Sequence, residues 1–319
     1  MDTQMWVITH KNYPGISDDL YRTLHVGRAL SQDLGYTGDD TGDNISLKNR
    51  NYCELTGLYW LWKNNQCDII GVCHYRRFFL EKGRMLTKEY IEKTLNDYDI
   101  IVPTCGMVKE ENVRKQYAAN HYEEDFDICR DVISEKYPEY VEAFDIMAES
   151  KLLNFCNMII TRKNIFDDYC KWLFDVLFEV EKRVDISYRD DYQKRIFGFL
   201  SERLIKVWLI KNEYKVKEQN VKMMDSDELD KKSSLNNAIR NVYQKITAGI
   251  LKKYLSPTVQ PEKINQSVCS DGRIPVWTYW WDGEEQSPEA VKKCIKSIRD
   301  NIDSNKYKLH VITLVDCQQ

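Results

Sequence analysis

Short runs of apolar residues alternate with amphipathic stretches along most of the chain. Apolar runs at 5–9 (MWVIT), 68–73 (DIIGVC), 99–103 (DIIVP) and 157–161 (NMIIT) predict strands, because each is only a few residues long and bounded by polar positions. Helical spacing of apolar positions predicts helices over 46–64 and 87–96, the second with Thr87 as its N-cap. The alternation of strand and helix predicts an α/β fold with a mostly parallel sheet flanked by helices.

The middle of the chain is richer in helical patterns. A helical region is predicted over 110–149, with a break near Pro138. Asn164 is the predicted N-cap of a strongly amphipathic helix, and another helix is predicted over 193–211.

The last third of the chain changes character. Polar stretches predict linkers at 225–234 and 257–273, on either side of an amphipathic helix over 235–255 that has four basic and no acidic residues. Residues 274–315 have the pattern of a new α/β unit that begins and then stops. We therefore expect a main domain at 1–225, a linker with a helix at 226–273, and a truncated second domain at 274–319.

Composition excludes several classes of protein. The net charge of −4 and the mixed distribution of charges give no reason to expect a nucleic-acid partner. The ten cysteines include no C-x-x-C pair, so a zinc site or a redox motif is not indicated. Neither a signal peptide nor a run of about 18 apolar residues is present, which predicts a reduced, cytoplasmic protein.

Two clusters of polar residues directly follow predicted strands. In open α/β sheets, ligands bind at the carboxyl ends of the strands, where cations can neutralise a diphosphate. An ordinary strand-end loop is the alternative for the first cluster, and a surface arginine pair is the alternative for the second. The clusters are Thr9, His10 and Lys11 after the first strand, and His74, Tyr75, Arg76 and Arg77 after the second.

A third cluster is a polar, glycine-containing loop that precedes the helix predicted over 46–64. Its amides and carboxylates suit the binding of an anion or of sugar hydroxyls, whereas simple helix capping is the alternative. The candidates there are Asp40, Asp43, Asn44, Ser46, Lys48 and Asn49.

A fourth cluster lies on the helix predicted over 193–211. Arg195, Gly198 and Glu202 fall within about 60° of one another on a helical wheel, away from the apolar side. Gly198 leaves room for a ligand, while an ion pair between Arg195 and Glu202 would be purely structural and would hold the carboxyl pKa low. Glu202 is our first candidate for a catalytic base, followed by Asp43 and Asp40; Asp190 and Asp191 rank lower because they precede the helix.

A metal site is not expected. Asp-x-Asp triplets occur at 97–99, 125–127 and 225–227, but only the last lies in a polar loop after a predicted strand. Basic residues occupy the position where a metal-binding pair would be expected, so we expect them to replace the cation.

The blocks DDTGDNISLKNRNYCELTGLYWLWKN, DIIGVCHYRRFF and RIFGFLSERL resemble a bacterial family formerly known only as a domain of unknown function. The resemblance covers about residues 4–215. Characterised relatives are galactofuranosyltransferases of polysaccharide biosynthesis with a GT-A-like fold. The stretch IPVWTYWWDGEEQSPEAVKKCIKSIRDN is similar to the opening of capsular-polysaccharide-synthesis transferases.

The resemblance implies an inverting glycosyltransferase that moves galactofuranose from its UDP donor, in β linkage, onto a lipid-linked or growing surface-polysaccharide acceptor. No cofactor beyond the UDP-sugar substrate is expected. A transferase of the same fold with another UDP-sugar, and a non-catalytic glycan- or nucleotide-binding module, remain as alternatives. The basic helix over 235–255 predicts peripheral association with the inner face of the cytoplasmic membrane, or else packing or homo-oligomer formation.

Overall fold

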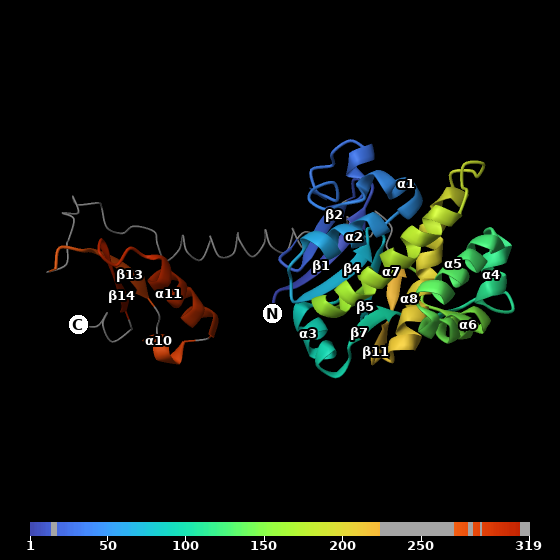
Figure 1. Cartoon of the computed structure of the whole chain (residues 1–319). Coiled ribbons are helices and arrows are strands. Elements are labelled where there is room, and N and C mark those ends of the chain that lie inside the picture. The colour runs from blue at the N-terminus through green and yellow to red at the C-terminus, as the bar shows by residue number, and fades with distance from the viewer. Residues whose placement is uncertain (14–17, 224–270, 280–282, 288, 313–319) are drawn as a thin grey trace. The chain divides into compact units, whose positions relative to one another are not determined.

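The computed structural model describes residues 1–13, 18–223, 271–279, 283–287 and 289–312. The chain divides into two compact units, Met1–Val242 and Tyr243–Gln319 (Figure 1). The domain boundary predicted at residue 225, the basic helix predicted over 235–255 and most of both predicted linkers lie outside the described residues.

A mostly parallel sheet forms the centre of the first unit. Its main path runs in the order β11-β7-β10-β4-β1-β2-β3. The pairs of β1 with β2 and with β4, of β2 with β3, and of β7 with β11 are parallel, whereas β10 is antiparallel to both of its neighbours. The strands are β1 Thr3–Thr9, β2 Tyr21–His25, β3 Thr37–Gly38, β4 Ile69–His74, β7 Ile100–Pro103, β10 Ile159–Arg162 and β11 Val216–Gln219. The predicted fold class, a mostly parallel α/β sheet flanked by helices, is confirmed.

Both faces of this sheet are buried, which explains why its central strands are continuous apolar runs rather than alternating ones. Along β1, Trp6 and Ile8 point into one hydrophobic core, while Met5 and Val7 point into the other. The larger core is completed by the helices α2 (Leu55–Asn64), α5 (Glu123–Lys136), α6 (Val141–Glu149), α7 (Lys163–Arg183) and α8 (Ile196–Asn212). The smaller core is completed by helix α3 (Lys88–Asp97) and strand β5 (Arg77–Glu81). Smaller strands branch from the sheet or pair with each other: β5 Arg77–Glu81, β6 Arg84–Met85, β12 Val221–Met223, and the pair β8 Gly106–Met107 and β9 Leu152–Leu153.

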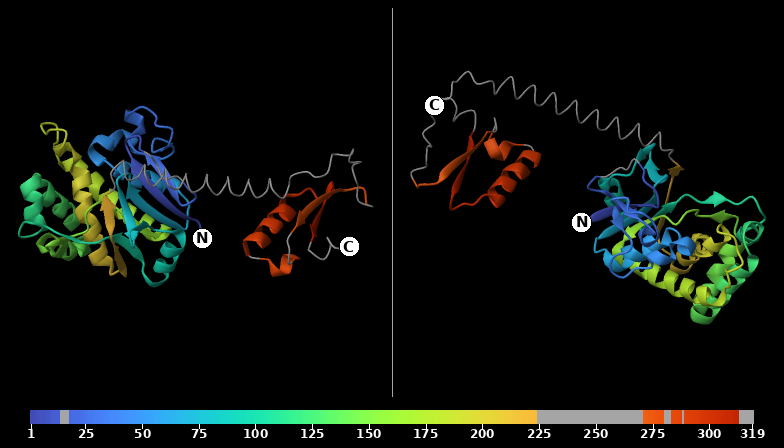
Figure 2. Two further views of the ribbon diagram at one scale, coloured as in Figure 1. Left: turned by 180° about the vertical axis from the view of Figure 1, so that it is seen from behind. Right: turned by 90° about the horizontal axis from the view of Figure 1, so that it is seen from above.

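Helices cover the sheet, and α4, α5 and α6 lie together away from the N-terminus in every view (Figures 1 and 2). Helix α3 has Thr87 as its N-cap, as predicted, with the Thr87 hydroxyl accepting from the amide of Tyr90. The helices are α1 Asn49–Tyr52, α2 Leu55–Asn64, α3 Lys88–Asp97, α4 Val113–Asn120, α5 Glu123–Lys136, α6 Val141–Glu149, α7 Lys163–Arg183 and α8 Ile196–Asn212. Single turns of 3-10 helix occur at η1 Arg28–Leu30, η2 Ser46–Lys48, η3 Pro138–Tyr140 and η4 Gln193–Arg195.

The single helix predicted over 46–64 is wrong, because the chain breaks at Cys53. Cys53 has a φ of 52°, which ends α1 and starts α2 in a new direction. The Asn49 side chain holds this break by donating from Nδ2 to the Cys53 carbonyl at 2.7 Å and to the Thr56 hydroxyl at 3.0 Å. No proline or glycine marks this position, so the break has no sequence signal of the usual kind.

Two further boundaries differ from the prediction. Helix α7 has Arg162 as its N-cap without a side-chain cap, so Asn164 lies inside the helix. Its first amide is instead satisfied by the sheet, since the Lys163 N–H donates to the Asp68 carbonyl. The second predicted strand, 68–73, is β4 and extends to His74; Arg77 begins β5, and His74 and Arg77 pair as a tight hairpin.

The second unit contains the predicted strand-helix-strand pattern. Strands β13 Ile274–Tyr279 and β14 Tyr307–Ile312 pair in parallel, and α10 Gly283–Gln286 and α11 Glu289–Asn301 lie between them in the sequence. No helix within the described parts of the chain is long and apolar enough to span a bilayer.

Candidate functional site

A cavity of about 530 Å³ opens at the carboxyl ends of β1 and β4. These strand ends are adjacent, because Ile8 of β1 pairs with His74 of β4 in a parallel register. Most of the residues predicted to bind the donor line this cavity. They are Thr9, His10, Lys11, Asn49, His74, Tyr75, Arg76, Arg77 and Arg195.

Positive charge dominates this first cavity. The cationic side chains of Lys11, Arg76, Arg77 and Arg195 all line it. Burial, followed by the charges of Lys11, Arg195 and Arg76, lowers the pKa of His10 and so favours its neutral imidazole. A dianionic group such as a diphosphate would offset the repulsion among these cations.

Two of the lining residues, Thr9 and Asn49, use their side chains to hold the backbone near the cavity. The Thr9 hydroxyl donates to the Lys11 carbonyl at 2.6 Å and accepts from the Lys11 amide at 3.1 Å, which shapes the loop after β1. Asn49 holds the break at Cys53. Their side chains therefore have internal hydrogen-bond partners.

A second cavity of about 310 Å³ adjoins the first. Five residues line both cavities and form a shared wall: Cys53, Glu54, His74, Arg77 and Arg195. The remaining lining comes from α4, α8 and their neighbours and includes Glu202.

The structural alternative considered for Glu202, an ion pair with Arg195, is not formed. Glu202 accepts a hydrogen bond from the Cys156 amide at 3.2 Å and pairs with Arg203 at 3.2 Å, while Arg195 donates from Nε to the Cys53 sulfur at 3.1 Å. Burial, opposed by the charge of Arg203, raises the pKa of Glu202 instead of lowering it. A carboxylate with a raised pKa is a stronger proton acceptor.

Gly198 lines the second cavity, and a Cβ at this position would make an ordinary van der Waals contact with the Cys53 sulfur at 3.4 Å. That its missing side chain makes room for a ligand stays a prediction.

Glu54 was not identified from the sequence, although it lines both cavities. Its carboxylate accepts from the Asn157 Nδ2 at 2.6 Å, and Asn157 in turn accepts from the Ser201 hydroxyl at 2.9 Å. Beside it, His74 is buried, and its Nε2 has no hydrogen-bond partner among the described residues. Burial lowers the pKa of His74, against the charge of Glu54, so the neutral ring is favoured.

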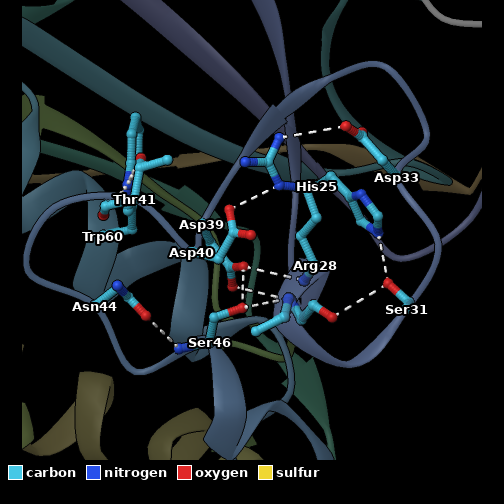
Figure 3. Close-up of polar contacts among 12 residues, drawn as sticks. His25, Arg28, Ser31, Asp33, Asp39, Asp40, Thr41, Asn44, Ser46 and Trp60 are labelled. Carbon is cyan, nitrogen blue, oxygen red and sulfur yellow. Dashed lines mark hydrogen bonds and ion pairs between the residues drawn. The ribbon is translucent and has the colours of Figure 1, made fainter.

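The polar loop over 39–48 is not part of either cavity, contrary to its predicted role. Asp40 pairs with Arg28 at 2.7 Å (Figure 3). The Asp43 carboxylate accepts from the Tyr59 hydroxyl at 3.0 Å, and Lys48 pairs with Glu181 at 2.6 Å.

The remaining loop candidates organise the backbone. The Asn44 Oδ1 accepts from the Ser46 amide at 3.2 Å, and the Ser46 hydroxyl donates to Asp39 (Figure 3). Asp190 accepts from the Gln193 amide at 2.8 Å as a local cap, and neither it nor Asp191 lines the cavities.

No group of three or more metal-ligating side chains occurs among the described residues. Asp99 accepts from the Lys215 amide at the far edge of the sheet, and Asp125 pairs with Arg189 inside the helical layer. Asp225 and Asp227 lie outside the described residues. The prediction that basic residues replace a metal therefore stays a prediction.

Comparison with known proteins gives matches along the whole chain. Residues 228–319 match the family described as "Capsular polysaccharide synthesis protein". A solved structure described as a WbbM bifunctional glycosyltransferase in its apo form aligns with a TM-score of 0.64 and 25% identity. The alignment covers 98% of this chain and 55% of that one, so the chain spans about half the length of this relative. No curated protein matches.

The resemblance to polysaccharide-biosynthesis glycosyltransferases seen in the sequence is confirmed by these matches. Residues 4–213, more than half of the chain, match the family described as "Domain of unknown function (DUF4422)". The chain belongs to this family.

Proposed function

We propose that the chain is a glycosyltransferase of polysaccharide synthesis, with its donor bound in the first cavity and its reaction centre at the shared wall. The observation that carries the proposal is the group of cations at the carboxyl ends of β1 and β4, next to a second cavity lined by two carboxylates. The match to a capsular-polysaccharide-synthesis family and the likeness to a bifunctional glycosyltransferase support it.

In this proposal the nucleotide diphosphate lies against Arg76 and Arg77. As the bond between the anomeric carbon and the diphosphate oxygen breaks, the electron pair leaves with the nucleotide diphosphate, and the two guanidinium groups stabilise the growing negative charge. Lys11 and Arg195 line the same cavity and add to this field. Charge of this kind performs the task for which other enzymes use a divalent cation.

Glu202 is the proposed general base. It accepts the proton of the acceptor hydroxyl while that oxygen forms the new bond to the anomeric carbon. Its raised pKa and its place in the cavity beside the shared wall support this role. Asp43 and Asp40 are less suitable, because they line neither cavity.

The finer features of the proposal come from the family resemblance. They are UDP-galactofuranose as the donor, inversion to a β linkage, a GT-A-like active site, and a lipid-linked acceptor at the cytoplasmic face of the membrane. The basic helix predicted over 235–255 would provide the membrane contact.

A donor screen tests the proposal. The purified chain is assayed for UDP binding by calorimetry and for UDP release from UDP-galactofuranose, UDP-galactose, UDP-glucose and UDP-N-acetylglucosamine. We expect release from UDP-galactofuranose and weaker UDP binding in Arg76→Ala and Arg77→Ala, but not in Arg84→Ala, which changes an exposed arginine outside both cavities.

Each other result has a definite meaning. Release from a different donor would replace the proposed sugar. UDP binding without release from any donor would favour the binding-module alternative. Failure to bind UDP would overturn the donor site.

A further inference from the structure

Part of the lining of the second cavity has no role in binding the proposed donor. Its own lining residues, separate from the shared wall, come mainly from α4 and α8, together with Tyr192 just before η4. Six of them are used below: Gln116, Asn120, His121, Tyr192, Phe199 and Arg203.

Three aromatic rings form one side of this cavity. The ring of His121 stacks on that of Phe199, with centroids 3.9 Å apart and planes at 21°. The Tyr192 ring lies 5.1 Å from Phe199 and 6.0 Å from His121, and Tyr192 remains 54% exposed. An exposed tyrosine braced by two other rings presents a rigid apolar face to whatever enters the cavity.

The histidine ring of this aromatic side is uncharged at neutral pH, and the Arg195 guanidinium lies beside the other two rings, 5.9 Å from the Tyr192 centroid and 5.6 Å from the Phe199 centroid. Burial lowers the pKa of His121 to about 4, opposed by the hydrogen bond that the His121 Nδ1–H donates to the Gln193 Oε1. The side chain therefore acts as a flat, neutral ring. Such a surface suits the C–H face of a sugar ring better than it suits a phosphate.

Polar groups line the same cavity. The Gln116 Oε1 accepts from the Arg203 Nη2 at 2.6 Å, and the Asn120 Nδ2 donates to the Gln116 carbonyl at 2.7 Å, which fixes both amide side chains. Arg203 is buried, yet its Nε has no hydrogen-bond partner among the described residues. A buried guanidinium N–H without a partner is costly, so this part of the helical layer carries an unsatisfied polar group next to the cavity lining.

We infer that the second cavity is the acceptor subsite, and that it takes a neutral glycosyl residue whose ring stacks on Tyr192. This inference rests on the proposed function. The stacked ring would present a hydroxyl toward Glu202, while Gln116 and Asn120 bind its other hydroxyls. The charged carrier of the acceptor lies outside this subsite.

The test compares two exposed tyrosines from one stretch of chain. Tyr192→Ala removes the stacking face, and Tyr192→Phe keeps it. Tyr188→Ala is the matched control, because Tyr188 is 61% exposed and lines neither cavity. The probes are octyl β-galactoside, octyl β-glucoside and octyl α-mannoside, with binding measured by saturation-transfer NMR in the presence of UDP and transfer measured by mass spectrometry.

We expect Tyr192→Ala to raise the KM or Kd of the accepted octyl glycoside about tenfold, which corresponds to about 1.4 kcal/mol. UDP affinity should stay unchanged, and Tyr192→Phe and Tyr188→Ala should resemble the wild type. Unaltered glycoside affinity in Tyr192→Ala, or an equal loss of UDP affinity, would overturn the inference. So would a wild type that binds UDP but none of the glycosides. A wild type that does not bind UDP would instead overturn the proposed function.

Discussion

Two carboxylates, Asp39 beside β2 and Glu202 on α8, differ in how completely their oxygens are bonded. Asp39 is fully buried and accepts four hydrogen bonds, from the amides of Gly27 and Arg28 and from the hydroxyls of Ser46 and Thr56. Figure 3 shows Asp39 between Arg28 and Ser46. It fixes the chain between β2 and α2. Every lone-pair direction of such a carboxylate is used, so it has no capacity left for a substrate.

Glu202 is the opposite case. Its side chain is 26% exposed and is held by the Cys156 amide and Arg203, while burial raises its pKa. Close by, the His74 Nε2 and the Arg203 Nε lack partners among the described residues. The comparison teaches that a polar cluster with complete hydrogen bonding maintains the fold, whereas an incompletely bonded cluster beside a cavity is a candidate for chemistry.

The largest effect should come from Glu202→Gln, which keeps shape and removes the proton acceptor. We expect kcat to fall by roughly 10²- to 10⁴-fold, with UDP binding and the unfolding transition retained. Asp191→Asn is the matched control, as an exposed carboxylate outside both cavities. Near-normal turnover by folded Glu202→Gln would remove Glu202 as the base, and a loss in Glu54→Gln instead would assign that role to Glu54.

Next in size is Arg77→Ala, which removes a cation from the shared wall. Transition-state stabilisation should fall by about 2–4 kcal/mol, measured as the decrease in kcat/KM for the donor. Arg76→Ala should act in the same direction. If both purified variants retain the kcat/KM of the wild type, the diphosphate does not bind at this hairpin.

Asp39→Asn tests the other half of the comparison, namely that the fully bonded carboxylate maintains the fold. An amide nitrogen would face donors that now bond a carboxylate, so the free energy of unfolding in urea should fall by about 3 kcal/mol. Turnover per folded molecule should persist. Asp33→Asn, at a 64% exposed side chain that pairs with the same Arg28, should change stability by less than about 0.5 kcal/mol. A stable Asp39→Asn protein with lost activity would contradict the structural assignment.

A smaller effect concerns pH. Because the pKa of Glu202 is raised above the ordinary glutamate value of 4.5, kcat should fall as the pH drops through that higher pKa. The same shift makes the folded state bind this proton more tightly than the unfolded state. The contribution of Glu202 to stability is therefore present at low pH and is lost as the pH rises through the folded pKa. Both effects should vanish in Glu202→Gln, which urea titrations and pH–rate profiles would show.

The smallest expected change is the response to EDTA. If Arg76 and Arg77 replace a metal at the leaving group, the rate of UDP release should stay unchanged in excess chelator. An absolute need for Mn²⁺ or Mg²⁺ would contradict this expectation and direct attention to Asp225 and Asp227.

The sequence predicted the buried strands well because their apolar runs are continuous. Strands β1, β4 and β7 follow from such runs. Strand β2 (YRTLH, Tyr21–His25) was missed because polar residues interrupt its apolar ones and its positions range from buried to exposed. The antiparallel direction of β10 was also not predictable, since direction depends on tertiary packing rather than on local pattern.

The site was predicted in part. The cations after β1 and β4 could be found because a strand end and a charge are both visible in sequence. Glu54 was missed because it lies within a helical pattern, and the turn at Cys53 that exposes it has no sequence signal. Asp40 and Asp43 were included because a polar, glycine-containing loop looks the same whether its carboxylates bind a substrate or their own backbone.

The walls of the two cavities come from separate stretches of the chain. Apart from the shared wall, the first is lined by residues 8–11, 26, 49–50, 75–76 and 223, and the second by residues 116, 120–121, 155, 192, 198–199 and 202–203. A combinatorial library restricted to 116, 120–121, 192 and 199 would therefore leave every residue that lines the first cavity unmutated. For the proposed transferase, such a library would vary the acceptor half-site while the donor half-site stays as it is.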